Sequence, residues 1–261
     1  MYDAAGPPGP RHTPDMGTAG HANQYRTKPK PNGSRPPVPQ LTQTDTGQQP
    51  CSQLWGARDC SVLVGPPSWS HHHHPTLQMR RIAASQPQCP PAALGWLARD
   101  PDRIVRYKTA ENLGTPPAAL ELLARDPDEG VRWTVAFRPD CTLAVAELLA
   151  RDEDYGVRIE IARNAHCPPR VLARLANNPD KAIRWRTAQN PSCPPATLAA
   201  LAADTDLSLR KAVADNPSSP PETLKRLLQD PQLIVAQAAA ANPNCPRAAL
   251  AMWQLAHSGT P

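Results

Sequence analysis

The sequence predicts an all-α fold in which about seven helical repeats of 26 residues stack into a solenoid. Three observations lead to this prediction. One small residue (Cys, Ser or Thr) recurs every 26 residues from Cys89 to Cys245 without an insertion. A column of Ala and a column of Leu recur in the same phase. Finally, residues 79–261 lack the apolar–polar alternation that is typical of a half-buried strand.

The repeat is defined by residues that occupy equivalent positions in successive units. The small residue precedes Pro-Pro or its equivalent and is found at Cys89, Thr115, Cys141, Cys167, Cys193, Ser219 and Cys245. The Ala column has no exception and comprises Ala84, Ala110, Ala136, Ala162, Ala188, Ala214 and Ala240. An invariant Ala indicates a point where units approach closely, because a larger side chain there would overpack the core.

Within one unit, the sequence predicts two helices joined by a turn. Cys193 is expected at the N-cap of the first helix, with the following Pro-Pro pair in its first positions, where a missing N–H costs nothing. Apolar residues at i, i+3 and i+4, from Leu198 to Ala202, then form one stripe on a helix of about ten residues. A shorter second helix places Leu209 inward and ends at Asn216. Its length is compatible with α or 3₁₀ geometry.

The N-terminal segment, residues 1–78, has a different composition. It holds 13 Pro, eight Gly and six of the eight His, and shows no apolar period. Such a segment cannot bury enough apolar surface to offset chain entropy, so we expect a disordered tail. Met79, at the start of the repeats, is an alternative start of the chain. We expect the solenoid to span residues 79–256, followed by a short tail at residues 257–261.

Charge and hydropathy exclude several classes of protein. The mean hydropathy is −0.52, and no run of about 18 apolar residues predicts a membrane span. The first 30 residues lack the apolar region of a secretory signal peptide. Residues 1–86 carry a net charge of +4 and residues 87–261 only +1. Because nucleic-acid binding through bulk charge needs a basic domain, this distribution argues against it.

These motifs carry a family resemblance. The unit, with its NP-x-(C/S/T)-PP signal, resembles the leucine-rich repeat variant, and its Asp-x₅-Arg spacing is similar to that of HEAT repeats. The spaced pairs are Asp100–Arg106, Asp126–Arg132, Asp152–Arg158 and Asp204–Arg210. The resemblance implies a right-handed superhelix and, in one type of member, a four-cysteine iron–sulfur cluster ahead of the repeats. Here only Cys51 and Cys60 precede the repeats, without a CxxC motif, so a cluster is not expected.

The seven cysteines predict packing rather than chemistry. Five of them occupy the small-residue column, where Ser and Thr also occur, and free Cys packs as a small hydrophobe. Successive units about 10 Å apart exceed the Cα separation of about 7 Å that a disulfide tolerates. An alternative is a metal or redox protein that uses Cys51, Cys60, Cys89 and the run His71–His74. We predict no metal site and no cofactor.

An Arg column predicts a structural ladder. It comprises Arg106, Arg132, Arg158, Arg184 and Arg210. Each of these residues follows an Asp by four positions, and most follow another by six, so bidentate pairing between helix ends is expected. The alternative is an anion-binding stripe, and with Trp133 and Trp185 it would give a nucleic-acid-binding protein. A column of Asn, which includes Asn164 and Asn190, is expected at helix ends and turns.

Two other columns vary instead of repeating, and these predict a binding surface. The residue after each Arg is Tyr107, Trp133, Ile159, Trp185, Lys211 and, in the last unit, Gln237. Four residues later, on the same helical face, lie Glu111, Phe137, Arg163, Gln189, Asp215 and Ala241. Because these positions accept large apolar and charged residues alike, we expect them to be partly exposed. The candidate partner-binding residues are Tyr107, Trp133, Phe137, Ile159 and Trp185. The alternative is that they pack over neighbouring repeats.

The sequence therefore predicts a non-enzymatic scaffold in the cytoplasm that presents a solenoid face to a protein or peptide. There is no GxGxxG, P-loop, HExxH or GxSxG motif, and no catalytic residue is proposed. Neither nucleic acid nor a membrane is expected as a partner. The last helix, which contains Trp253 and Leu255, has no further repeat to cover it, so it is either capped by the final residues or used for self-association.

Overall fold

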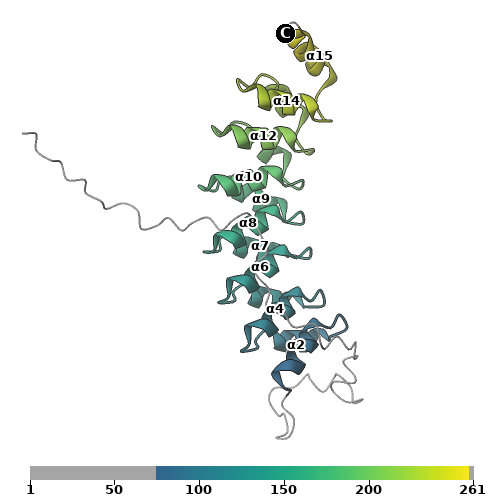
Figure 1. Cartoon of the computed structure of the whole chain (residues 1–261), viewed down its shortest axis with the longest axis vertical. Helices are drawn as coiled ribbons and strands as arrows, with labels where there is room; N and C mark the ends of the chain where they lie inside the picture. Colours follow the sequence, from purple (N-terminus) through teal and green to yellow (C-terminus); the bar gives the residue numbers. More distant parts are fainter. Residues whose placement is uncertain (1–74, 259–261) are drawn as a thin grey trace, which may run out of the picture. The chain divides into compact units, whose positions relative to one another are not determined.

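The computed structural model describes residues 75–258, which form fourteen α-helices and contain no strand (Figure 1). Seven longer helices alternate with seven others along the chain. The longer helices are α2 (Leu77–Ser85), α4 (Arg103–Glu111), α6 (Glu129–Phe137), α8 (Tyr155–Arg163), α10 (Lys181–Gln189), α12 (Leu207–Asp215) and α14 (Leu233–Ala241). The others are α3 (Pro91–Leu97), α5 (Pro117–Leu123), α7 (Leu143–Leu149), α9 (Pro169–Leu175), α11 (Pro195–Leu201), α13 (Pro221–Leu227) and α15 (Arg247–His257).

The helices pack in two layers, which we call the long-helix layer and the short-helix layer. Each long helix contacts the next long helix, from α2 to α14, and the short helices α3, α5, α7 and α9 contact one another in order. Figure 1 shows the helix pairs following one another along a single stack. The predicted all-α solenoid of about seven repeats is confirmed.

The relative lengths of the two helices differ from the prediction. The first helix of each unit before α15 has seven residues rather than about ten, and the second has nine residues; of the two geometries left open for it, it adopts the α-helical one. An Asp side chain stabilises the start of the second helix in most units: Asp102, for example, caps α4 by accepting a hydrogen bond from the Val105 backbone N–H. Tight i→i+3 bonds occur instead at the end of the first helix, where the Asp100 N–H donates to the Leu97 carbonyl.

The predicted N-cap lies one residue too early. Pro194, not Cys193, occupies the N-cap of α11, and the helix begins at Pro195. In the same column, the Thr115 and Ser219 hydroxyls donate backward to the Thr109 and Val213 carbonyls of the preceding long helix. In these two units the hydroxyl therefore satisfies the end of one helix rather than the start of the next.

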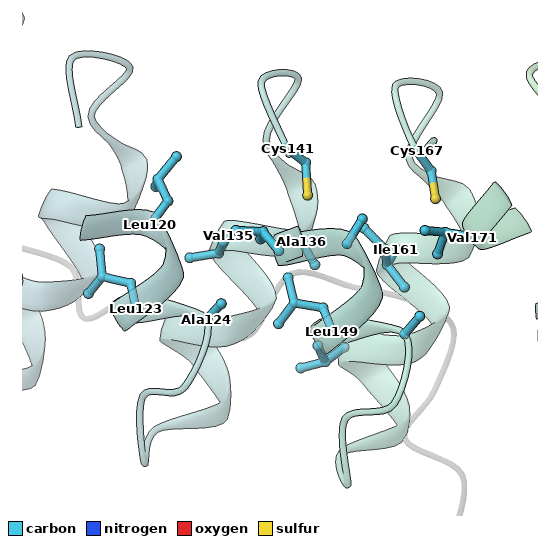
Figure 2. Close-up of a cluster of buried hydrophobic side chains, with 14 of the residues drawn as sticks. Leu120, Leu123, Ala124, Val135, Ala136, Cys141, Leu149, Ile161, Cys167 and Val171 are labelled. Carbon is cyan, nitrogen blue, oxygen red and sulfur yellow. The ribbon is translucent and has the colours of Figure 1, made fainter. Parts of the chain in front are cut away.

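The core lies between the two layers and is continuous from repeat to repeat. The Ala column from Ala84 to Ala214 has no solvent-exposed surface at any of its six positions, as its invariance predicts. Figure 2 shows Ala136 beside Val135, with Leu120 and Leu149 contributed by the neighbouring short helices. None of the helices between residues 75 and 258 is both long and apolar enough to cross a membrane.

The helical array of the described chain runs from α2 to α15. Helix α2 begins at Leu77 and helix α15 ends at His257. The structure does not describe residues 1–74. Cys51, Cys60 and the run His71–His74 of the Pro-rich tail lie in this part of the chain. Its predicted disorder remains a prediction.

Candidate interaction face

A ladder of ion pairs joins successive repeats at the loops that lead into the long helices. In each pair the Arg Nε lies 2.6–2.9 Å from an Asp oxygen of the next repeat, 20 residues later. This Arg–Asp ladder comprises Arg80–Asp100, Arg106–Asp126, Arg132–Asp152, Arg184–Asp204 and Arg210–Asp230. The Arg column thus holds neighbouring repeats together.

The sequence predicted that Arg would pair with carboxylates, but it assigned the wrong ones. Asp100, six positions before Arg106, binds it only through its backbone carbonyl, which accepts a hydrogen bond from the Arg106 Nη1 at 2.9 Å. The Asp four positions earlier, Asp102, caps its own helix and pairs with Arg81. Because a seven-residue helix and its turn bring equivalent loops side by side, the repeat that follows in space supplies the carboxylate.

A second ladder runs along the opposite loops, which lead out of the long helices. The Asn216 Nδ2 donates to the carbonyls of Ala188 and Asn190, 28 and 26 residues earlier, at 2.6 and 2.9 Å. Its Oδ1 accepts from the Ser218 N–H. The same bonds recur in a set that we call the Asn ladder: Asn112, Asn164, Asn190, Asn216 and Asn242. The predicted turn position is correct, but the bonds reach the previous repeat.

One repeat replaces this Asn with an Arg, which the sequence analysis missed. Arg138 donates through Nη1 to the carbonyls of Ala110 and Asn112 at 2.6 and 2.7 Å. Its guanidinium is buried and pairs with Asp140 two residues later. The sequence signal that could have identified it is an Arg in the Asn column followed by an Asp two residues later.

The Arg–Asp ladder is interrupted at a single joint of the described chain. Arg158 donates to the Asp152 and Glu153 carbonyls like its counterparts, yet no ion pair links it to the next repeat within residues 75–258. Asn178 stands where the other repeats have Asp. Its Oδ1 accepts from the Asp180 N–H, as the Asp carboxylates do, so its Nδ2 occupies the place of the second carboxylate oxygen. Two donors then meet where a donor and an acceptor normally pair.

The predicted partner-binding residues lie on the side of the long helices opposite to the column of Val105 and Thr109. Val105 and Thr109 point into the core and are fully buried. The opposite side carries the residues equivalent to 104, 107, 108 and 111, which share one helical face at i, i+3, i+4 and i+7. We call this side of helices α4, α6, α8, α10 and α12 the outer face.

Exposure along the outer face is uneven, so the expected partial exposure is found at some of the predicted residues and not at others. Phe137 is 63% exposed, and Trp133 and Trp185 are partly buried against the hydrophobic clusters. Tyr107 and Ile159 are buried, with 9% and 7% of their surface exposed. Tyr107 and Ile159 belong to a buried cluster formed by residues of several repeats, so packing between repeats covers them. The remaining apolar surface centres on Phe137.

Trp133 and Phe137 form the most prominent apolar feature of the outer face. Their rings stack one helical turn apart on α6, with centroids 5.7 Å apart and an interplanar angle of 8°. Gly156 on the neighbouring helix α8 has no side chain, and a Cβ there would lie 4.0 Å from Trp133 Cδ1. The indole of Trp133 therefore extends toward α8, and the Phe137 ring stacks on it.

Charged residues on the outer face form pairs within single helices, with one exception. Lys108–Glu111 and Arg163–Glu160 each have a nitrogen–oxygen separation of 3.2 Å, and Lys211–Asp215 on α12 one of 2.6 Å. Burial raises the pKa of the Glu160 carboxyl above its usual range. The exception is Arg186, whose guanidinium lies over the Trp185 ring at 4.6 Å.

The cysteines between residues 89 and 245 show no reactive environment. All five are buried, free thiols, and Figure 2 shows the Cys141 and Cys167 sulfurs pointing into the core from equivalent loops. Burial raises the pKa of Cys141, Cys167 and Cys193 to about 12, so these thiols stay protonated and unreactive at neutral pH. Within residues 75–258 no three His, Cys, Asp or Glu residues group in a way that could hold a metal ion.

The short-helix layer contains a groove that sequence reasoning missed. It has a volume of about 610 Å³ and lies between α9 and α11, with Ala173, Ala196 and Ala200 in its lining. Its sequence signal is Ala200, because the equivalent position in the other units carries a large side chain: Trp96, Leu122, Leu148, Arg174, Arg226 or Met252.

The two layers, the Arg–Asp ladder and the Asn ladder define the class of protein: an all-helical repeat solenoid held together by polar bonds between loops. The family model of the leucine rich repeat variant matches residues 209–232. A solved structure described as "a leucine-rich repeat variant with a novel repetitive protein structural motif" is 30% identical, with a TM-score of 0.51. The match covers 71% of this chain and 76% of that one. No curated protein gives a significant match.

The chain belongs to the leucine-rich repeat variant family.

Proposed function

We propose that the solenoid is a non-enzymatic interaction scaffold that binds a protein or peptide partner through its outer face. The observation that carries this proposal is the exposed Phe137 ring stacked on Trp133. A rigid aromatic pair on a regular helix is the kind of anchor that dominates binding energy in protein interfaces. Tyr107 and Ile159 are buried at the equivalent positions of α4 and α8, and Trp185 occupies that position on α10, where it is partly buried. The five buried free thiols fit a reducing compartment such as the cytoplasm.

The nucleic-acid alternative loses most of its residues in this structure. It relied on Arg106, Arg132, Arg158 and Arg184, three of which are paired with Asp. Their guanidiniums lie at the loops and contribute to stacking, so they do not form a free cationic stripe beside the aromatic pair. Any nucleic-acid binding would show a steep dependence on salt concentration.

The test is a pull-down from nuclease-treated lysate with the full chain, compared with a Phe137→Glu variant. The matched control is Leu113→Glu, because Leu113 is equally apolar and 70% exposed but lies in a loop away from the outer face. We expect the control to capture the same protein as the wild type and Phe137→Glu to lose it. If Phe137→Glu captures the same protein as the control, the outer face is not the binding surface.

We also propose self-association through the C-terminal end. Helix α15 contains no buried residue, and Met252 and Leu255 are about 70% exposed. Leu233 and Ile234 on α14 add exposed apolar surface to the same end. A helix that is apolar on both sides normally packs on both sides. Sedimentation velocity of the full chain should show a concentration-dependent dimer that Met252→Glu/Leu255→Glu abolishes. A wild-type chain that stays monomeric at all concentrations would exclude this role.

A further inference from the structure

The outer face carries one desolvated positive charge without an acidic partner. Within residues 75–258, each other Lys or Arg of that face on α4, α8 and α12 pairs with an acid of its own helix. Arg186 on α10 forms no ion pair there and has only a long bond of 3.4 Å from Nη1 to the Gln189 side-chain oxygen. Burial and the nearby Arg163 lower the pKa of the Arg186 guanidinium. Both effects indicate that its surroundings disfavour its charge.

The Glu160 carboxylate attracts the Arg186 guanidinium but does not neutralise this charge. Glu160 on α8 is 3% exposed and already bonded to Arg163. Two guanidiniums therefore share one buried carboxylate, and the local charge of this group is +1. The Arg186 guanidinium lies over the Trp185 ring, 4.6 Å from its centroid, and this contact restricts the side chain, which reduces the entropy lost when the guanidinium binds a planar anion.

This charge lies on the opposite side of α8 from the aromatic pair. Helix α6 carries Trp133 and Phe137, α10 carries Trp185 and Arg186, and both helices pack against α8. Neighbouring helices lie about 9–10 Å apart, so the two features are separated by roughly 20 Å. An extended chain covers that distance in about six residues.

On the basis of the proposed function, we propose that the partner of the outer face is an acidic peptide segment. An apolar side chain of this segment covers Phe137, and a carboxylate about six residues away forms a bidentate bond with Arg186. Charge complementarity supports this occupant, since an anion would neutralise the group formed by Glu160, Arg163 and Arg186. Nucleic acid would need several unpaired cations in a row, and the outer face offers one.

A selection from a random 14-residue peptide display library tests this inference on the full chain. The same library is applied to Arg186→Glu and to Phe137→Glu, and each folded state is checked by thermal unfolding. Enriched peptides should carry an apolar residue and Asp or Glu about six positions apart. Arg186→Glu should reverse the preference to Lys or Arg at that position. For one enriched peptide, replacing the acid with its amide should weaken binding measured by fluorescence anisotropy by about tenfold.

The outcomes separate this inference from the proposed function. If enriched peptides depend on Phe137 but show no acidic preference, or the same peptides bind Arg186→Glu, the acidic partner is wrong and the scaffold stands. If no peptide depends on Phe137, both proposals fail. If a uridine oligonucleotide binds and Arg186→Glu abolishes it, the site takes nucleic acid and the inference is overturned. If Arg186→Glu does not fold, Arg186→Gln replaces it in the selection. This variant removes the positive charge and should lose the preference for acidic peptides.

Discussion

The loop edges and the outer face of the long helices differ in what repeats. At the loops, the same bonds recur from unit to unit, with Arg to Asp 20 residues later and Asn to carbonyls 26 and 28 residues earlier. On the outer face, successive units carry aromatic, charged, small or polar residues at one position. The comparison shows that the constant columns hold the stack together, whereas the variable columns are free to serve recognition.

The joint at Asn178 provides an internal control for this comparison. It keeps every other element of the loop but lacks the carboxylate, so Arg158 has no ion pair to the next repeat among the described residues. The buried residues also divide into two main clusters near this joint, one ending at Ile183 and the other beginning at Ala176. Polar bonds between repeats are thus fewest between α8 and α10, near the boundary between the two hydrophobic clusters.

The largest effect is expected from removing a ladder Arg. Arg132→Ala should lower the free energy of unfolding by about 2–4 kcal/mol, because it leaves the buried Asp152 carboxylate without its partner. Arg158→Ala, which breaks no ion pair, should lower it by less than about 1 kcal/mol. Urea unfolding followed by circular dichroism measures both. Equal losses would mean that the carbonyl bonds, not the ion pairs, stabilise the joint.

A slightly smaller effect is expected in the Asn ladder. Asn216→Ala removes three hydrogen bonds at a site that is 2% exposed, and should lower the free energy of unfolding by about 2–3 kcal/mol. Phe137→Ser on the outer face should change it by less than about 0.5 kcal/mol. The same unfolding assay compares them. A large loss in Phe137→Ser would show that the outer face contributes to folding.

The loss of stability at low pH should arise in part from the Asp carboxylates that pair with Arg of another repeat. Hydrogen bonds from Arg210 and Arg81 lower the pKa of Asp230 and of Asp102 below the usual Asp range. Because these pKa values are lower in the folded chain, their stabilisation is full above the ordinary Asp pKa of about 4 and is lost as pH falls through the folded values. Thermal unfolding between pH 7 and pH 3 should show this loss, and Asp230→Asn should show a smaller one. Identical pH profiles would rule out this contribution of Asp230.

The smallest expected effect is a gain. Asn178→Asp restores the missing carboxylate opposite Arg158 and should raise the free energy of unfolding at pH 7 by about 0.5–1 kcal/mol. The gain should disappear when the new carboxylate is protonated at low pH. Asn177→Asp, an exposed neighbour of the same type, is the matched control and should give no gain. A destabilised Asn178→Asp would show that the joint depends on Asn.

Particular elements show how far the sequence alone predicts the site. The Ala column and the Leu column located the core correctly, because an overpacked position tolerates only one size of side chain. Arg106 was expected to pair with carboxylates and does, but its partner Asp126 belongs to the next repeat. The outer-face columns were located correctly, yet Tyr107 and Ile159 are buried, because packing between repeats decides exposure. The binding role of these residues is still a prediction.

The sequence by itself determined the period, the helical class and the order of the helices in this protein, because those properties depend on local spacing and on residues such as Pro and Asp at helix starts. Only the tertiary structure decided which loops meet, and therefore which carboxylate each Arg binds and which backbone carbonyls each Asn reaches. It also decided that Arg186 and Phe137 lie on helices at either side of α8, and that Arg186 has no ion pair among residues 75–258. A periodic sequence offers each side chain an equivalent partner in every repeat, and only the stacking geometry selects the one within bonding distance.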